Sequence, residues 1–455
     1  MPTTQCLPHL RLGFHPTRSV DVAFDLPELS SDGGVLVLRQ LDERLGLSDL
    51  VAGCLPDRRD PRKVIHSRVE QVRQRLFQIA LGYEDGNDAT TLRHDRLLKT
   101  ACDRLPEDAN GLSSQPSLSR LEHAMTARDI VRLQRALEQA YVNELPDDTV
   151  VVVLDIDTTD DPTHGQQPLT FFHAHYDRRI YFPVLLFDGD GRLVSVRLRP
   201  GNAGNYRYAA PMLERVIRLI KARFPAAQVV VRGDAGFCAP RLLDRLDALD
   251  SECGDVEYVL GIQKNSVLQR LAAEAMSIAS ARQAESRCAA RVFTSFMYRA
   301  RSWSRERYVI AKAEHMPLGP NPRFVVSSFD DFPPRILYEW GYCGRGQAEN
   351  HIKDLKNALA ADRLSCTTYV ANAFRLLLHA SAYRLLFALR THVGAVAPAL
   401  ATVQFDTLRL RLLKVAARVV QSVRRVVVSL PSTFPLAGVF RAVLASLDVA
   451  PVAAP

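Results

Sequence analysis

The chain has 455 residues, which is too long for one compact core and predicts a multidomain protein. Hydrophobic residues make up 47% and charged residues 24%, so the composition is that of a folded protein and leaves little room for long disorder. Lys and Arg number 58 against 50 Asp and Glu, and the formal net charge of +8 favours a polyanionic partner, although a merely basic enzyme also fits it.

Eight cysteines are scattered singly and form no Cys-x-x-Cys pair, so neither a disulfide framework nor a zinc finger is expected. The amino terminus from Met1 to Ser19 lacks a continuous apolar segment, and no run of about 18 apolar residues occurs in the chain. We therefore expect a cytoplasmic protein without a membrane partner.

The first 145 residues are predicted to form a helical region that binds DNA. Asp60 to Leu81 carries apolar residues at helical spacing among several arginines, which indicates a basic amphipathic helix. Gly82 to Asp88 has the composition of a turn, and the helical patterns of Ala89 to Arg104 and Leu121 to Leu133 follow. Three short helices separated by turns are typical of a helix-turn-helix module, whereas the alternative is a helical lid with solvated charges.

A new domain is predicted to begin near residue 146. Thr149 to Ile156 is a continuous β-branched and aliphatic run, the pattern of a buried central strand. Further strands and one helix are predicted at Phe171 to Tyr176, Ile180 to Phe187, Leu193 to Leu198, Tyr208 to Phe224 (the helix) and Gln228 to Arg232. Asp188 to Gly191 supplies a hairpin turn, and the order of elements predicts an α/β fold.

The second half of the chain is predicted to contain a β-rich insertion and then helices. Val256 to Ser328 is rich in strand patterns, and Pro333 to Arg390 is strongly helical. Leu408 to Leu430 carries many basic residues and predicts a helix leading into a strand, either a second DNA contact or a solvated surface. The chain is thus divided into residues 1–145, 146–255, 256–332, 333–395 and 396–455.

Two aspartates follow the predicted buried strands. Asp157 closes the run that begins at Val150, and Asp234 follows the run Val229 to Gly233. Ligands of open α/β sheets bind beyond the carboxyl ends of the strands, so both carboxylates are candidates for a metal site. Taken alone, either aspartate could be an ordinary turn residue or helix cap.

Four polar side chains of the predicted helix from Tyr338 to Asp362 share one face. At about 100° per residue they fall within an arc of roughly 60°. They are Tyr342, Arg345, Glu349 and Lys356. The alternative is a solvated face with a few ion pairs.

This face adds a third carboxylate and candidate phosphate ligands to the two aspartates. Hard divalent cations prefer carboxylate oxygens from several elements, so Glu349 is expected to join both aspartates as a catalytic residue and metal ligand. Arg345 and Lys356 are suited to phosphate, and Tyr342 to a phosphate or a base. The sequence therefore predicts a clamp for a DNA end beside a metal site.

The spacing Tyr342-x2-Arg345-x3-Glu349-x6-Lys356 matches the Tyr-Arg-Glu-Lys signature of bacterial insertion-sequence transposases with a DDE site. The segments Asp155 to Gly165 and Arg232 to Cys238 resemble the two aspartate motifs of one subgroup of that family. The resemblance covers most of the chain and implies an RNase H-like catalytic core with a β-rich insertion between the second aspartate and the glutamate.

The resemblance also implies a function. Such a protein binds the terminal inverted repeats of its insertion sequence, cleaves the DNA ends and transfers the 3′-OH ends to target DNA by two-metal phosphoryl transfer. It implies two Mg²⁺ ions, for which Mn²⁺ can substitute, a dimer on paired ends, and a place at the bacterial nucleoid. Some relatives release the element through a hairpin. The alternatives are an RNase H-like nuclease without strand transfer, a silent DNA-binding repressor descended from a transposase and, more remotely, a phosphatase.

Two assignments stay open at this point. Asp155 and Asp157 lie on the same face of one strand, and only the family's Asp-x-Thr motif, which Asp157 resembles, favours Asp157. Trp303 lies among arginines in the β-rich insertion, where it is a candidate DNA-binding platform for an extruded base or, alternatively, part of a small core.

Overall fold

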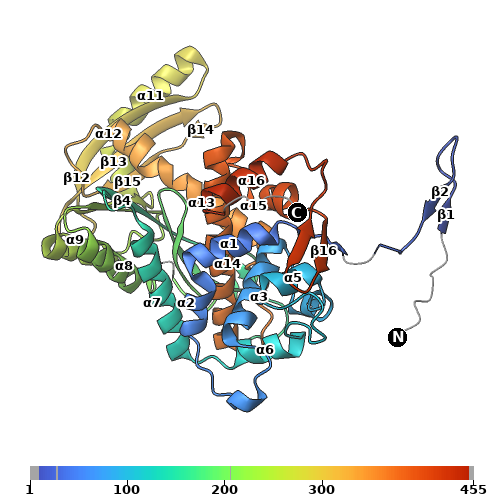
Figure 1. Cartoon of the computed structure of the whole chain (residues 1–455). Helices are drawn as coiled ribbons and strands as arrows, with labels where there is room; N and C mark the ends of the chain where they lie inside the picture. Colours follow the sequence, from blue (N-terminus) through green and yellow to red (C-terminus); the bar gives the residue numbers. More distant parts are fainter. Residues whose placement is uncertain (1–9, 27–28, 205, 450–455) are drawn as a thin grey trace.

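The protein, seen in a computed structural model, is described over residues 10–26, 29–204 and 206–449 and has a large mixed sheet at its centre (Figure 1). The strands of this sheet are β4 (Val151–Thr158), β8 (Val184–Asp188), β9 (Leu193–Arg197), β10 (Gln228–Gly233), β11 (Val256–Ile262), β12 (Ala290–Tyr298), β13 (Arg307–Met316), β14 (Gly319–Pro320) and β15 (Arg323–Ser327). Their order is β12-β13-β15-β11-β10-β4-β8-β9, with β14 paired to β13.

The predicted α/β fold is confirmed. The predicted strands at β4 and β10 lie side by side as parallel strands inside the sheet, and β11 pairs parallel with β10. The turn Asp188 to Gly191 joins β8 to β9 as an antiparallel hairpin, and β8 pairs antiparallel with β4. A separate small sheet has the order β5-β7-β6 and consists of β5 (Asp161–Pro162), β6 (Phe171–His173) and β7 (Arg178–Tyr181).

Side-chain alternation along β4 separates an apolar face from a polar one. Val152, Leu154 and Ile156 join the core that includes α8 (Ala209–Arg223) and α9 (Pro240–Cys253). Because successive side chains of a strand point to opposite faces, Asp155 and Asp157 project away from this core. They face the side of the sheet on which α14 and the segment around Gly341 lie.

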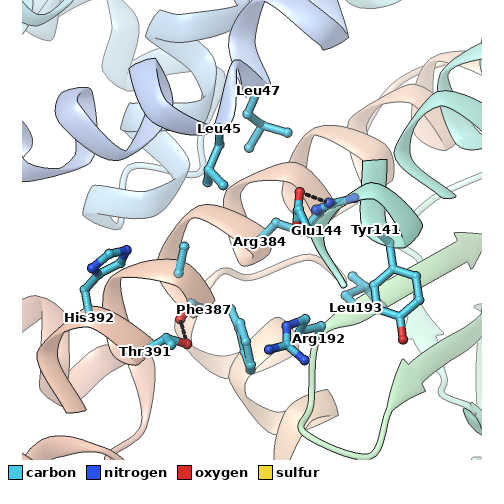
Figure 2. Close-up of a pocket in the computed structure, with 11 residues that line it drawn as sticks. Leu45, Leu47, Tyr141, Glu144, Arg192, Leu193, Arg384, Phe387, Thr391 and His392 are labelled. Carbon is cyan, nitrogen blue, oxygen red and sulfur yellow. Dashed lines mark hydrogen bonds and ion pairs between the residues drawn. The ribbon is translucent and has the colours of Figure 1, made fainter. Parts of the chain in front are cut away.

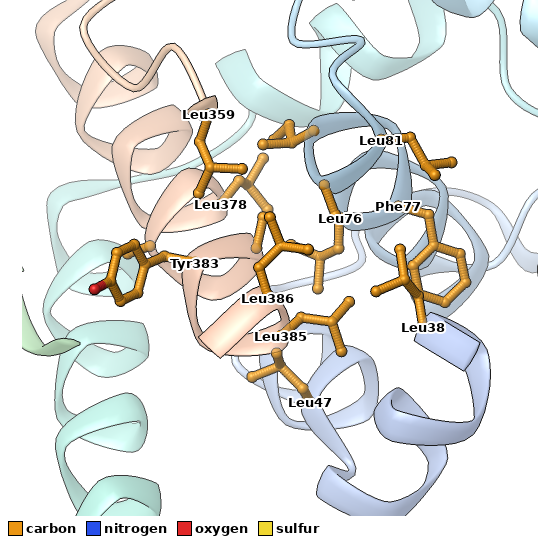
Figure 3. Close-up of a cluster of buried hydrophobic side chains, with 14 of the residues drawn as sticks. Leu38, Leu47, Leu76, Phe77, Leu81, Leu359, Leu378, Tyr383, Leu385 and Leu386 are labelled. Atoms are coloured by element: carbon orange, nitrogen blue, oxygen red, sulfur yellow. The ribbon is translucent and has the colours of Figure 1, made fainter. Parts of the chain in front are cut away.

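The long helix α14 (Tyr369–Val396) organises that other side. It packs on β9 and on helices from the first 145 residues, and Figure 3 shows its side chains interlocked with theirs. The helices in contact with α14 are α1 (Val35–Leu45), α3 (Arg68–Leu81), α6 (Gln115–His123) and α7 (Ala127–Glu144), and the same region also contains α2 (Leu47–Gly53), α4 (Ala89–Leu92) and α5 (Arg96–Ala101). Short 3₁₀ turns lie at η1 (Pro61–Lys63) and η2 (Gly86–Asp88). The amino-terminal helices therefore share one hydrophobic core with α14.

The predicted basic face of α3 does not reach solvent, which corrects the expectation that it meets phosphate. Every residue from Gln71 to Leu81 is buried, and Arg73 is only 4% exposed. Arg73 pairs with Asp42 at 3.1 Å, and Arg75 lies 3.8 Å from Glu122. Helical spacing cannot distinguish a solvated arginine from one that is neutralised inside a protein.

The segment 256–332 extends the central sheet. Its first strand, β11, lies between β10 and β15, and β13 and β12 continue the same sheet to its edge. Two helices that the strand-rich pattern did not predict, α10 (Ser266–Leu271) and α11 (Ala273–Ser286), lie within it, and α11 packs on β12 and β13. The division of the chain into five segments stays a prediction.

The carboxyl-terminal region has a short helix followed by a hairpin and a last helix, as the basic pattern predicted in part. After η6 (Pro398–Leu400), its elements are α15 (Phe405–Leu408), the π-helical turn η7 (Arg409–Leu413), β16 (Ala417–Gln421), β17 (Val426–Ser429) and α16 (Ala437–Ser446). β16 also pairs with β3 (Leu29–Ser30). Arg424 and Arg425 are exposed at the hairpin turn, whereas Arg409 donates to backbone carbonyls inside the protein.

At the amino-terminal side, the hairpin of β1 (Leu10–Leu12) and β2 (Val20–Val22) projects away from the body (Figure 1). The seven cysteines of the described residues form no disulfide, while Cys6 lies outside those residues. Within the same part of the chain, no helix has the length and apolar character needed to span a bilayer.

Truncating the core around α14 should destabilise the protein. Leu386 is fully buried, so Leu386→Ala should cost about 2–5 kcal/mol through lost burial and the cavity left behind. Leu410, which is 71% exposed, provides the control, and Leu410→Ala should change stability by less than about 0.5 kcal/mol. Thermal unfolding of the two variants measures the difference, and equal midpoints would contradict this packing.

Candidate active site

The segment that carries Glu349 is helical but irregular. It runs through α12 (Pro334–Ile336), the π-helical turn η3 (Leu337–Tyr342), the 3₁₀ turn η4 (Cys343–Gly346), α13 (Gln347–Lys353) and a second π-helical turn, η5 (Asp354–Ala358). The regular 100° spacing used to place four side chains on one stripe therefore does not hold along it. Mid-helix π turns change the angle at which the following side chains leave the axis.

Most of the predicted site residues nevertheless line one cavity. This cavity has a volume of about 420 Å³ and lies between the ends of β4 and β10 and the α13 segment. Its lining consists of Asp157, Thr158, Thr159, Asp234, Arg345, Glu349, Ile352, Lys353, Lys356 and Asn357. Of the four signature residues, Arg345, Glu349 and Lys356 line the cavity and Tyr342 does not.

The two aspartates lie at the ends of neighbouring parallel strands. Asp157 is near the end of β4, and its Oδ1 accepts a hydrogen bond from its neighbour Thr158 N at 2.8 Å. Asp234 follows β10, and its Oδ1 accepts from Gly236 N at 2.8 Å, which fixes the turn out of the strand. The parallel register of β4 and β10 places these strand ends side by side.

The cavity holds its carboxylates at an electrostatic cost. The pKa of the Asp157 carboxyl is raised to about 6, mainly by burial and further by the carboxylates of Asp234 and Glu349, while Thr158 N and Arg345 act in the opposite direction. The guanidinium of Arg345 lies 3.8 Å from Asp157 Oδ2. A cation in the cavity would lower the energy of the ionised carboxylates.

Asp155 has a different environment from Asp157. Its two oxygens accept hydrogen bonds from Arg232 Nε and Nη2, each at 2.6 Å, and its side chain is almost fully buried. Asp155 is thus neutralised by a bidentate ion pair, whereas Asp157 lines the cavity with Asp234 and Glu349.

The side chains that line the cavity include the oxygen donors that a hard divalent cation prefers. Its ionisable donors are three carboxylates, and neither His nor Cys lines it. Glu349 makes no hydrogen bond or ion pair with another described residue, so its oxygens are available. Within the described ranges, however, no three or more His, Cys, Asp or Glu side chains lie close enough together to hold an ion. The three carboxylates line one cavity, but they do not form a complete coordination site for a metal ion.

Arg345 and Tyr342 form a stacked pair at one side of the cavity. The guanidinium carbon of Arg345 lies 5.2 Å from the centre of the Tyr342 ring, and Tyr342 packs on Tyr338 at 5.6 Å between ring centres. The hydroxyl of Tyr342 lies close above Gly261 of β11, where a Cβ would approach it to 2.7 Å. Tyr342 therefore supports Arg345 from behind the cavity wall.

Lys356 lines the other side and is tied to the loop that follows β4. Its Nζ donates to the backbone oxygen and to Oδ1 of Asp160, both at 2.8 Å, and lies 3.8 Å from Asp362. Neighbouring Asp161 is buried, and neither of its side-chain oxygens has a hydrogen-bond partner among the described residues. Burial raises the pKa of Asp161, and the nearby Asp362 adds to the shift.

Trp303 lies in a core and not at the surface. It is 5% exposed, its ring contacts Tyr298 at 5.4 Å between ring centres, and it belongs to the cluster beneath α9. Trp303 is therefore part of a hydrophobic core, the alternative considered from the sequence, and is not among the proposed DNA contacts.

A second pocket, of about 270 Å³, lies away from the carboxylates between α2, α7 and α14 (Figure 2). Arg384 and Glu144 form an ion pair across it, and its remaining walls include Leu45, Leu47 and Phe387. None of the site carboxylates lines it.

Two residues near the cavity were not assigned from the sequence. Arg232 stands in the second aspartate motif, and Asp160 in the first. The signal for Arg232 was available, because an arginine inside a buried β strand needs a buried acidic partner on a neighbouring strand. No such signal existed for Asp160, because its contact with Lys356 joins segments 196 residues apart.

A mixed α/β sheet with carboxylates at adjacent strand ends, a third on a facing helix and basic side chains beside them defines a site for metal-dependent chemistry on phosphate esters. A family model, Transposase DDE domain group 1, matches residues 13–452. The chain belongs to this family and is a metal-dependent DNA transposase.

Comparison with curated proteins gave no match. Among solved structures, the chain is similar to the cryo-EM structure of the piggyBac transposase synaptic complex with hairpin DNA, at 11% identity and a TM-score of 0.43, over 84% of this chain and 79% of that chain.

The two aspartates of β4 should respond in opposite ways to neutralisation. Asp155→Asn leaves the buried Arg232 without its charged partner and should cost about 3 kcal/mol. Asp157→Asn removes a desolvated charge that two like charges repel, so it should stabilise the metal-free protein. Thermal midpoints at pH 7 in EDTA measure both, and a stabilising Asp155→Asn or destabilising Asp157→Asn would contradict the assignment.

Proposed function

We propose that the protein binds the terminal inverted repeats of its own insertion sequence, cleaves both ends and joins them to target DNA. One observation carries this proposal: carboxylates from β4, β10 and α13 line one cavity together with Arg345 and Lys356. Family membership supplies the reaction class, and the cavity supplies residues suited to it.

We further propose that half of the central sheet is an RNase H-like core. The order β9-β8-β4-β10-β11 places β4 in the middle, with the antiparallel hairpin of β8 and β9 on one side and the parallel strands β10 and β11 on the other. This arrangement supports the proposal because it puts Asp157 on the central strand and Asp234 on the next one, beneath the helical segment that carries Glu349.

In this proposal Asp157, Asp234 and Glu349 hold two Mg²⁺ ions, for which Mn²⁺ can substitute. Bound cations of this kind activate the attacking oxygen and stabilise the leaving 3′ oxygen. The Glu349 side chain makes no hydrogen bond or ion pair with another described residue and lines the cavity with both aspartates, so its oxygens are available to a cation there. We assign Asp157 and not Asp155 as the first ligand because both oxygens of Asp155 accept hydrogen bonds from Arg232.

The bond changes of the proposed reaction are those of two successive phosphoryl transfers. In the first, water attacks the phosphorus at the element end and its oxygen stays on the 5′ phosphate, while the P–O3′ bond breaks and the 3′ oxygen takes up the proton that the water gives up and becomes a free 3′-OH. In the second, this 3′-OH attacks a phosphorus of target DNA and releases a target 3′-OH. Arg345 orients a phosphate oxygen through its planar fork, and Lys356 adds a point charge beside the Asp160 loop.

The proposed partners follow from the reaction. Both ends of an element must be handled together, so we propose a dimer on paired ends, acting at the nucleoid. Exposed Arg424 and Arg425 at the β16–β17 turn are candidate contacts to the DNA backbone. The buried arginines of α3 do not belong to this set.

The principal alternative is an RNase H-like nuclease that cuts DNA without joining it, since the same carboxylates would serve it. A silent DNA-binding repressor is the other. A strand-transfer assay with pre-cleaved ends separates them, because only the transposase converts a free 3′-OH into a joint with target DNA.

Removing any of the three carboxylates should abolish end cleavage and spare end binding. Asp157→Ala, Asp234→Ala and Glu349→Ala each delete a proposed metal ligand, and we expect cleavage to fall by at least about 10³-fold. Binding should stay within about threefold of the unchanged protein, because most affinity comes from distributed phosphate contacts. Gel-shift and cleavage assays on the same preparations measure both.

Asp148→Asn is the matched control, since Asp148 is exposed and lies outside the cavity. It should cleave normally. Full activity of any of the three alanine variants would contradict the proposed ligand set.

Arg345→Ala and Lys356→Ala should slow processing of the terminal nucleotides by about 10- to 100-fold, with a smaller effect on overall binding. Both side chains line the cavity, whereas Arg335 is exposed on the same helical segment and, among the described residues, forms an ion pair only with Glu339. Arg335→Ala is therefore the control and should process ends normally. Single-turnover cleavage rates measure the effect. Equal rates for all three variants would contradict the proposal that Arg345 and Lys356 hold the DNA end.

A further inference from the structure

The buried ion pair between Asp155 and Arg232 has no direct part in the proposed chemistry, yet it lies directly behind the cavity. The two residues face each other on the paired strands β4 and β10, two positions before Asp157 and Asp234 respectively. Their bidentate contact fixes the plane of the guanidinium, because both Nε and Nη2 are held at 2.6 Å.

The same guanidinium also contacts the segment that carries Glu349. Its Nη1 lies 3.4 Å from the backbone oxygen of Gly341 and donates a hydrogen bond to it. It also lies against Gly344, where a Cβ atom would overlap Nη1. Gly344 directly precedes Arg345, and Glu349 follows on the next turns of the helix. Arg232 therefore joins both aspartate strands to η3 and η4.

Elsewhere the helical segment is held by apolar packing and, beyond Glu349, by polar contacts of Asp354 with Phe405 N and Arg390 and of Lys356 with Asp160. Leu337 and Tyr338 pack on Val259 at one end, and Ala348 and Leu355 enter the core around α14 at the other. Apolar contacts are non-directional and leave the height of a helix above a sheet poorly defined. The fixed fork of Arg232, positioned between these two contacts, supplies a directional one.

We propose that Asp155 and Arg232 are positioning residues that set the place of Glu349 relative to Asp157 and Asp234. Arg232 holds η3 and η4 at the ends of β4 and β10, and Asp155 fixes the orientation of Arg232. A glycine at position 344 is required because the guanidinium occupies the space of a side chain. This inference rests on the proposed metal site and adds to it two residues that touch neither metal nor DNA.

The two glycines of η4 provide a matched pair of variants. Gly344→Ala places a methyl group against Arg232 Nη1, and the guanidinium cannot move aside without breaking its contacts with Asp155. Gly346→Ala places the same group where no atom lies within 4 Å, so it is the control. Arg232→Lys is a further variant that keeps the buried positive charge but loses the fork.

Iron-directed backbone cleavage shows which segments of the chain lie near the bound ion, and it does not depend on catalytic turnover. Fe²⁺ replaces Mg²⁺ at carboxylate sites, and with ascorbate and peroxide it generates radicals that cut the protein backbone near the ion. The full-length protein on end DNA should be cut near Asp157, Asp234 and Glu349. In Gly344→Ala and Arg232→Lys the cut near Glu349 should weaken at least about tenfold relative to the two strand cuts, and Mg²⁺-dependent end cleavage should fall about 10- to 100-fold.

The outcomes separate the inference from the proposed function. Loss of the Glu349 cut in Gly344→Ala, with normal end binding and a normal pattern in Gly346→Ala, supports the inference. Unchanged cuts in Gly344→Ala and Arg232→Lys, with or without a lower thermal midpoint, would show that the pair is only structural and overturn it. If the unaltered protein is not cut near the three carboxylates, the proposed metal site fails, and the inference fails with it.

Discussion

The arrangement of the protein depends on gathering like-charged carboxylates in one partly buried cavity. Burial and repulsion raise the pKa of Asp157 to about 6, so the charges do not stay together unless the surrounding structure holds them. The parallel register of β4 and β10 holds Asp157 and Asp234 at one edge, and apolar packing beneath the sheet and around α14 keeps that edge rigid. The helical segment with Glu349 is the element whose position these contacts determine least.

The strands that position the aspartates could be predicted from sequence because both are continuous apolar runs inside the sheet. These runs identified β4 and β10, and the turn from Asp188 to Gly191 identified the hairpin of β8 and β9. The convergence of Glu349 with both aspartates came from its resemblance to a family signature, since the regular helix assumed for the stripe is interrupted by π-helical turns. Spacing alone would not have placed Tyr342 behind the cavity.

The surroundings of several other residues could not be predicted, because they depend on tertiary contacts that the local sequence pattern does not specify. Arginines of α3 have the spacing of a solvated face but are neutralised by acidic residues from other helices, such as Asp42 for Arg73. Trp303 has arginine neighbours in sequence and an apolar core in space. Arg232 was visible in the sequence, but its role depends on Gly344, which approaches it only through the tertiary fold.

The most direct test of the account is the position of the metal ions in a complex with cleaved DNA ends. A crystal of the protein on such ends, grown with Mn²⁺, locates each ion by its anomalous scattering. The account predicts peaks within coordination distance, about 2.0–2.3 Å, of Asp157, Asp234 and Glu349, beside the 3′-OH. Peaks held by Asp155, or by Asp160 and Asp362, with Glu349 turned away would contradict it.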